Sequence, residues 1–239
     1  MRRRPSVKKV RELIASLQAY ESLPGVFNPW RDIDPNYDLT PAAPKIRSQH
    51  LERYLQYRVP YARFILLAEA VGYQGGRFSG IAMTSERILL GHHPTIDPAW
   101  VAPGGGFSRT SRPELRRLGF NEPTATIVWT AVHELGISPF EVILWNTFPF
   151  HPYRPDQGAL TNRTPTREEL ALGQSYLSAL LALCPQAMVI AIGKKAEATL
   201  TALNIPCTPV RHPANGGATA FRLGLRRIQN LRVAHGDYR

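Results

Sequence analysis

Apolar runs of strand length alternate along the chain with segments whose apolar residues recur at helical spacing. Four short and almost continuous apolar runs have the pattern of strands buried on both faces of a parallel sheet, at residues 64–68, 140–145, 187–192 and 207–210. Helical spacing predicts helices at residues 7–20, 45–57, 87–90, 124–135, 165–183, 194–203 and 221–231. Strands that alternate with helices predict an α/β fold, here a single three-layer α/β/α domain with a central four-stranded parallel sheet.

Long loops rich in Pro and Gly connect these elements. Residues 24–44 are predicted to wrap the surface, and residues 72–80, which contain four glycines, are predicted to be a loop over a strand end. Residues 92–112 form a third loop, of a length that is uncommon in compact domains and often functional. Thr164 is the predicted N-cap of the helix that begins at Pro165.

The charge of the chain indicates the kind of partner it binds. Its 239 residues include 29 Lys and Arg against 18 Asp and Glu, a formal net charge of +11, and arginines cluster at residues 2–4, 116–117 and 222–232. A basic domain of this size is typical of a protein that binds a polyanion, so DNA is the expected partner. The alternative is an even surplus of charge that serves solubility.

Length and hydropathy indicate the location and the domain organisation of the protein. No apolar stretch reaches the roughly 18 residues of a membrane span, so no membrane partner is expected. The basic start at residues 1–5 lacks the apolar core of a signal peptide, so the expected location is cytoplasmic, at the nucleoid through DNA binding. We expect a monomer with one domain over residues 1–239, in which residues 1 to about 60 form an N-terminal helical and loop extension.

Metal chemistry is not expected. Two cysteines, Cys184 and Cys207, are too few for a disulfide framework or a four-thiolate cluster. His92 and His93 invite a metal site, but no third ligand stands at a recognisable spacing. The expected cofactor content is therefore none, with no iron–sulfur cluster.

Three candidate functional residues stand where predicted strands end: Glu69, Asn146 and His212. Ligands of open parallel sheets bind just beyond the carboxyl ends of the strands. We therefore expect all three at one crevice. An Asn amide places a donor beside an acceptor, which matches the edge of uracil and not that of cytosine. A His ring can donate to an oxygen that gains negative charge, and an aromatic ring such as Phe78 can stack on a base.

Each of these residues also has a structural alternative. Glu69 could cap a neighbouring loop, and Asn146 could bond to nearby backbone, as Asn often does. His212 could be a surface or structural residue, and Phe78 could simply anchor its loop in the core.

Five short motifs follow one another in matching strand and helix contexts. They are Ala68-Glu-Ala-Val-Gly72, Gly75-Gly-Arg-Phe-Ser-Gly80, Asn146 at a strand end, Asn162-Arg-Thr-Pro-Thr-Arg-Glu-Glu169 and His212-Pro-Ala214. Together they resemble the uracil-DNA glycosylase superfamily, most closely its iron–sulfur-bearing (family 4-like) bacterial and archaeal branch. The cluster cysteines of that branch are absent. The similarity runs from about Arg63 to Asn215.

The resemblance implies the α/β/α fold of that superfamily and a monofunctional hydrolase that excises uracil from DNA in base excision repair, leaving an abasic site. It implies that Phe78 stacks on a flipped uracil, that Asn146 reads the uracil edge, and that His212 stabilises the departing uracil anion. Glu69 is the other expected catalytic residue, which orients water or steadies the sugar cation. The remaining expected contacts are to the substrate through Ala70, Gly72, Tyr73 and Gln74, including backbone amides near Ala70 and Tyr73, and to DNA through Arg77, Arg163, Arg211 and Asn215.

The chain departs from the superfamily pattern at several positions. Ala70 stands where relatives carry an Asp or Asn that activates the attacking water, and an acidic residue usual a few positions later falls near Gly75. Asn215-Gly-Gly217 stands where some relatives carry a bulky residue that fills the gap left by the flipped base. Two alternatives therefore stay open: a glycosylase for another deaminated base such as hypoxanthine, and a low-turnover protein that binds uracil or abasic sites in DNA.

Overall fold

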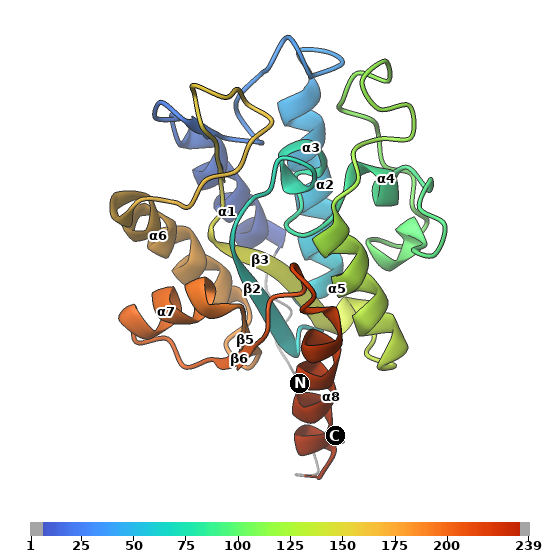
Figure 1. The fold of residues 1–239 in the computed structure, drawn as a ribbon, viewed down its shortest axis with the longest axis vertical. Coiled ribbons are helices and arrows are strands. Elements are labelled where there is room, and N and C mark those ends of the chain that lie inside the picture. The colour runs from blue at the N-terminus through green and yellow to red at the C-terminus, as the bar shows by residue number, and fades with distance from the viewer. Residues whose placement is uncertain (1–6, 235–239) are drawn as a thin grey trace.

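A four-stranded parallel sheet lies at the centre of the computed structural model, which describes residues 7–234 (Figure 1). Its strand order is β3-β2-β5-β6. The strands are β2 (Phe64–Ala70), β3 (Val142–Phe148), β5 (Met188–Ile192) and β6 (Thr208–Val210). This confirms the predicted α/β architecture with a central four-stranded parallel sheet.

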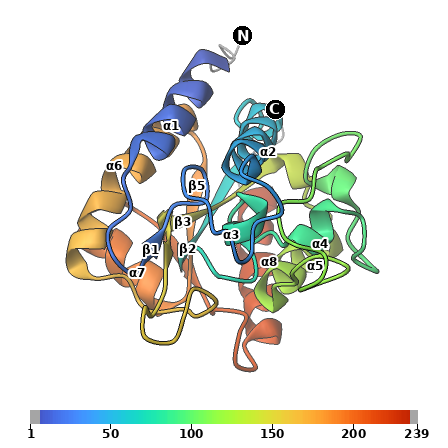
Figure 2. The same cartoon turned by 90° about the horizontal axis from the view of Figure 1, so that it is seen from above.

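Among the described residues, six longer helices surround the sheet, and those on its two faces give the molecule three layers. The six are α1 (Val7–Ala19), α2 (Ala43–Arg58), α5 (Pro123–Glu134), α6 (Arg167–Leu183), α7 (Lys194–Ala202) and α8 (Ala218–Ala234). Helices α6 and α7 pack on one face, while α5 and α8 lie on the other (Figure 2). Each predicted helix of this set is present, with ends that differ from the prediction by a few residues.

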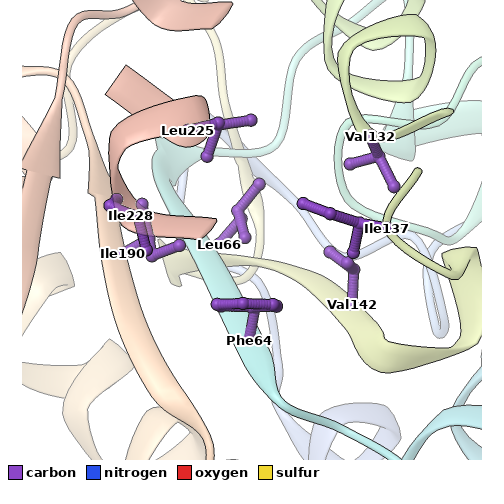
Figure 3. Close-up of a pocket in the computed structure, with 8 residues that line it drawn as sticks. All are labelled: Phe64, Leu66, Val132, Ile137, Val142, Ile190, Leu225 and Ile228. Carbon is purple, nitrogen blue, oxygen red and sulfur yellow. The ribbon is translucent and has the colours of Figure 1, made fainter. Parts of the chain in front are cut away.

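An apolar space between the sheet and the layer of α5 and α8 shows which side chains face these helices (Figure 3). Its lining is entirely hydrophobic and comprises Phe64, Leu66, Val132, Ile137, Val142, Ile190, Leu225 and Ile228. A wall without polar groups cannot orient a polar ligand, so this space belongs to the core. The lining also shows which residues of each strand face α5 and α8, because residues two apart along a strand point to the same face of the sheet.

The N-terminal segment covers one edge of the sheet. The backbone N–H of Leu144 on edge strand β3 donates to the hydroxyl of Tyr54 on α2, at 2.7 Å, so the helix satisfies a donor that no neighbouring strand can pair. The short strand β1 (Val26–Phe27) pairs antiparallel with β4 (His151–Pro152). The residues expected as an extension at 1–60 thus pack into the same hydrophobic core as the sheet, as far as the structure describes them.

Two local predictions were wrong. Residues 72–80 are not all loop, because α3 (Gly76–Ser79) forms one helical turn within them. Tertiary contacts hold that turn: His50 Nδ1 lies 3.0 Å from the carbonyl oxygen of Ser79, and Gly80 ends the turn with a left-handed φ of 75°. The predicted loop at 92–112 likewise contains a short 3₁₀ turn, η1 (Pro98–Trp100).

The start of α6 also differs from the prediction. The N-cap is Thr166 and not Thr164, and it forms a capping box in which Thr166 and Glu169 each accept from the other's backbone N–H. Two further short elements complete the fold, α4 (Glu86–Leu89) and the 3₁₀ turn η2 (Pro139–Glu141).

Candidate active site

The carboxyl ends of the strands meet the longest loops at one end of the molecule, the top of Figure 1. The segment after β2 carries α3, the segment after β3 leads to α6, and the segment after β6 leads to α8. Strands β3 and β6 are the two edges of the sheet, and β2 lies beside β3. A candidate site at this end is therefore centred on the glycine loop that follows β2.

Asn146 is the clearest sign of a ligand site at this end. It lies on β3, is only 2% exposed, and its side-chain Oδ1 is shielded from solvent without a hydrogen-bond partner among the described residues. Its register partner is Ala68, two residues beyond Leu66, so its side chain points to the face covered by α5 and α8. Buried amide oxygens normally accept a hydrogen bond, so this unsatisfied acceptor is suited to an N–H donor from a ligand.

His212 presents the complementary group, a donor. The backbone N–H of Ala214 donates to its Nδ1 at 3.1 Å, so Nδ1 carries the lone pair and the ring proton sits on Nε2. Burial, with a smaller effect from neighbouring Arg211, lowers the pKa of His212 below its ordinary value. The neutral ring can therefore donate from Nε2 to an oxygen that becomes negative.

A tight turn holds the His212 ring in place. Asn215 and Gly216 both have left-handed φ values, 52° and 74°. Gly217 has no room for a side chain, because a Cβ there would clash with the carbonyl oxygen of His212. A Cβ on Gly193, after β5, would lie 2.9 Å from the Cβ of His212. The glycines thus allow the backbone to close around the ring.

Glu69 does not share the side of the sheet that Asn146 occupies. Asn146 pairs with Ala68, and the next residue along β2 points to the opposite face. The Glu69 carboxylate forms an ion pair there with Lys195 of α7, at 3.2 Å. The expectation that strand-end residues 69, 146 and 212 converge is therefore corrected for Glu69, because side chains alternate along a strand.

Phe78 lies on α3 with no exposed surface. Its ring stacks on that of Phe120, with centroids 4.0 Å apart and planes 13° from parallel. The guanidinium carbon of Arg77 lies 4.7 Å from the Phe78 centroid. Because the Phe78 ring has no exposed surface and Phe120 covers one of its faces, the expected stacking role stays a prediction.

Two of the arginines expected to contact DNA are occupied within the protein. Arg77 is 0% exposed and pairs with Asp34 at 2.6 Å. Arg163 donates to both carboxylate oxygens of Glu169, at 2.6 and 2.7 Å, and to the carbonyl oxygens of Tyr153 and Gly25. The Arg77 guanidinium is buried and the Arg163 guanidinium is engaged by protein oxygens, so as folded neither is presented to a phosphate, and both anchor loops around the site.

The other predicted contacts lie at the surface of the strand ends. Arg211 and Asn215 are exposed, while Ala70, Gly72, Tyr73 and Gln74 are half-buried. The backbone N–H of Tyr73 already donates to Oδ1 of Asn162, at 3.1 Å, so this amide is not free to stabilise a substrate anion as expected. The substrate roles of these residues stay predictions.

Glu122 is a residue that the sequence patterns did not single out. Its carboxyl group lies against the glycine loop: a Cβ on Gly72 would be 3.0 Å from Oε1, and one on Gly75 would be 2.6 Å from Cδ. Burial raises the pKa of Glu122 to about 7. Its only sequence signal was its place before Pro123, which is typical of a helix start.

The residues that the structure describes include no group of three His, Cys, Asp or Glu placed to hold a metal ion. Cys184 is buried and Cys207 half-buried, both as free thiols. The expectation of no cofactor stays a prediction, which iron analysis of the purified protein tests. Within the same residues, no helix is both long and apolar enough to cross a bilayer.

Known proteins support the fold. The structure resembles that of "WT Pedobacter heparinus SMUG2", with a TM-score of 0.63 and 13% sequence identity over 96% of this chain and 99% of that one. A search of curated proteins finds no match. The profile of the "Uracil DNA glycosylase superfamily" matches residues 88–230, more than half of the chain.

The superfamily match over more than half of the chain defines the class of protein, a DNA glycosylase, which is a hydrolase that cuts the bond between base and sugar. The chain belongs to the uracil DNA glycosylase superfamily. This confirms the superfamily inferred from the five motifs, and it makes DNA the substrate polymer.

Proposed function

We propose that the protein excises uracil from DNA by hydrolysing the N-glycosidic bond, and that it leaves an abasic site. The observation that carries this proposal is the buried amide of Asn146, whose Oδ1 has no partner among the described residues. An acceptor beside the NH₂ donor of the same amide fits the N3–H and O4 of uracil. Cytosine offers the reverse order, an acceptor at N3 and a donor at N4, and would leave this pair mismatched.

His212 supplies the expected chemistry of bond cleavage. As the C1′–N1 bond breaks, its electron pair moves into the uracil ring and charge grows on O2. The Nε2–H of His212 is neutral and held by its own loop, since Nδ1 accepts from Ala214 at 3.1 Å. A fixed donor costs no reorganisation as charge develops, which is the electrostatic contribution that usually dominates enzyme catalysis.

An excision assay tests the proposal. Oligonucleotides that carry one uracil, hypoxanthine or thymine are incubated with the protein, and abasic sites are then cleaved with alkali. Cleavage at uracil alone is the expected result. Cleavage at hypoxanthine alone favours the glycosylase for another deaminated base, and tight binding of uracil-containing or abasic DNA without cleavage favours the low-turnover binding protein. Monomeric state and cytoplasmic location are part of the same proposal, and light scattering and cell fractionation test them.

Asn146→Asp tests the recognition step. The substitution replaces the amide donor by a second acceptor, which repels O4 of uracil, so uracil excision should fall sharply. A thermal unfolding curve establishes that the variant is folded. Full uracil activity in the folded variant would remove Asn146 from base recognition.

A further inference from the structure

The loop after β2 holds a carboxyl group that comes from another part of the chain. Glu122 precedes α5, and its carboxyl group occupies the space beside Gly72 and Gly75. At Gly75 even a methyl group would collide with Oε2, so the absence of a side chain at the two glycines makes room for the carboxylate. The two segments fit each other closely at the carboxyl edge of the sheet.

This carboxyl group has no structural partner among the described residues. Although the Glu122 residue is partly exposed, its Oε2 is shielded from solvent and accepts no hydrogen bond. Nor does the side chain cap α5. Glu86 shows the contrast: it is buried, and its carboxylate accepts from the backbone N–H groups of Thr110 and Ser111, at 2.7 and 2.9 Å. Glu86 holds a loop in place through these hydrogen bonds. Glu122 also carries the free-energy cost of desolvation, but no hydrogen bond within the described residues offsets it.

The position of Glu122 relative to the sheet matches the substrate side. Helix α5 covers the same face to which Asn146 points, while Glu69 points to the face covered by α7. Ala70, at the end of β2, has no polar side-chain atom. Glu122 is thus a carboxyl group that the fold brings to the glycine loop on the Asn146 side.

We propose that Glu122 is the catalytic carboxylate that binds and deprotonates the attacking water. This role rests on the proposed glycosylase function. The C1′–N bond breaks and its electron pair leaves on the base, while the water oxygen bonds to C1′ and one water proton passes to the Glu122 carboxylate. The base anion then takes up one proton, and Glu122 releases its own to solvent, so that one water is consumed for each bond cut.

The chemical state of Glu122 suits a base that works near neutral pH. Burial is the single cause of its raised pKa of about 7, and no charged neighbour contributes to the shift. The carboxylate form is therefore populated at and above neutral pH, and a base with this pKa accepts a proton more readily than an ordinary Glu does.

The experiment compares three variants in single-turnover excision across pH 5–9: Glu122→Gln, Glu122→Asp and the control Glu134→Gln. Glu134 lies at the other end of α5 and pairs with Arg222 at 2.8 Å. Affinity for an abasic oligonucleotide and thermal unfolding are measured on the same preparations. In the wild type we expect a rate that rises with pH around an apparent pKa near 7.

For Glu122→Gln we expect a loss on the order of 10²-fold in rate at pH 8, loss of the rising limb, and abasic-site affinity within twofold of wild type. Glu122→Asp should recover part of the rate and part of its rise with pH. Glu134→Gln should have the rate and the pH profile of the wild type. A folded Glu122→Gln variant with wild-type rate and pH profile would overturn the role of Glu122 alone. A wild type that excises no base would instead overturn the proposed function, and with it this role.

Discussion

His212 is fixed in one tautomer by its own loop. The backbone N–H of Ala214 makes Nδ1 an acceptor, and Nε2 keeps the proton. His212→Ala should therefore lower single-turnover excision by about 10²–10³-fold, the usual cost of one preorganised donor, with affinity for abasic DNA nearly unchanged. Glu69→Gln is the matched comparison and should cost less, because that carboxylate is paired with Lys195 on the other face of the sheet. Equal, small losses of rate in both variants would mean that His212 is not the group that stabilises the charge on the departing base.

Glu122 also makes the stability of the fold depend on pH. Its pKa is about 7 in the folded state against an ordinary value of 4.5, so the unfolded chain releases this proton first as pH rises. The contribution of Glu122 to stability therefore falls between pH 4.5 and 7, by up to about 3 kcal/mol. Glu122→Gln should unfold at a higher temperature than the wild type at pH 8 and at a similar temperature at pH 4.5. A constant difference between the two proteins across this range would contradict the raised pKa.

Sequence reasoning selects residues that stand in local motifs and passes over residues that only tertiary contacts place. Asn146 and His212 could be named as candidates because a strand end and a short motif mark each of them, and their roles stay predictions. The burial of Arg77 could not be predicted, because its partner Asp34 lies 43 positions away in a loop. Glu122 could not be predicted either, since only the folded chain brings it to Gly75.

At the scale of elements, the capping box of α6 fixes how the segment after β3 enters its helix. Thr166 accepts from the N–H of Glu169, and Glu169 also holds Arg163. Thr166→Ala should cost about 1 kcal/mol, typical of a lost N-cap. Thr164→Ala is the control: its exposed hydroxyl accepts from Nζ of Lys195 and caps no helix, so the substitution should cost less than half as much. Denaturant unfolding measures both, and a larger cost at Thr164 would favour the cap predicted from sequence.

The contrast between local pattern and tertiary contact also explains which helices and strands could be predicted from the sequence. The four strands and the longer helices follow from the spacing of apolar residues, which burial in one core imposes on the chain. The strands extend past their predicted ends to Ala70 and Phe148 because the ladder between β2 and β3 continues through polar residues. The turn of α3 has no such spacing and depends on contacts such as that between His50 and Ser79.

At the scale of the whole molecule, the net charge of +11 is divided among arginine clusters in different places. The cluster at residues 2–4 lies outside the described residues. Arg116 and Arg117 are exposed on a loop whose backbone is held by Arg109, which donates to both of their carbonyl oxygens. That loop leads into Phe120, and the guanidinium carbon of Arg116 lies 5.6 Å from the Phe120 ring centroid. This cluster therefore borders the candidate site.

The arginines of α8 lie elsewhere. This helix starts near the strand ends and runs away from them toward the bottom of Figure 1, and Arg226 and Arg227 are exposed on it. The two clusters thus offer matched pairs of adjacent, exposed arginines, one beside the site and one along a helix that leads away from it.

Salt dependence distinguishes the two clusters. Each phosphate neutralised on duplex DNA contributes about 0.9 to the slope of log affinity against log salt, because counterions are released on binding. If Arg116 and Arg117 contact phosphates, replacing both by Ala should reduce that slope by about 1.8 and weaken binding to all sequences alike. Replacing Arg226 and Arg227 should leave the slope unchanged. The reverse result would place the DNA along α8 and away from Asn146 and His212, and equal effects would mean that the basic surface attracts DNA without a defined path to the site.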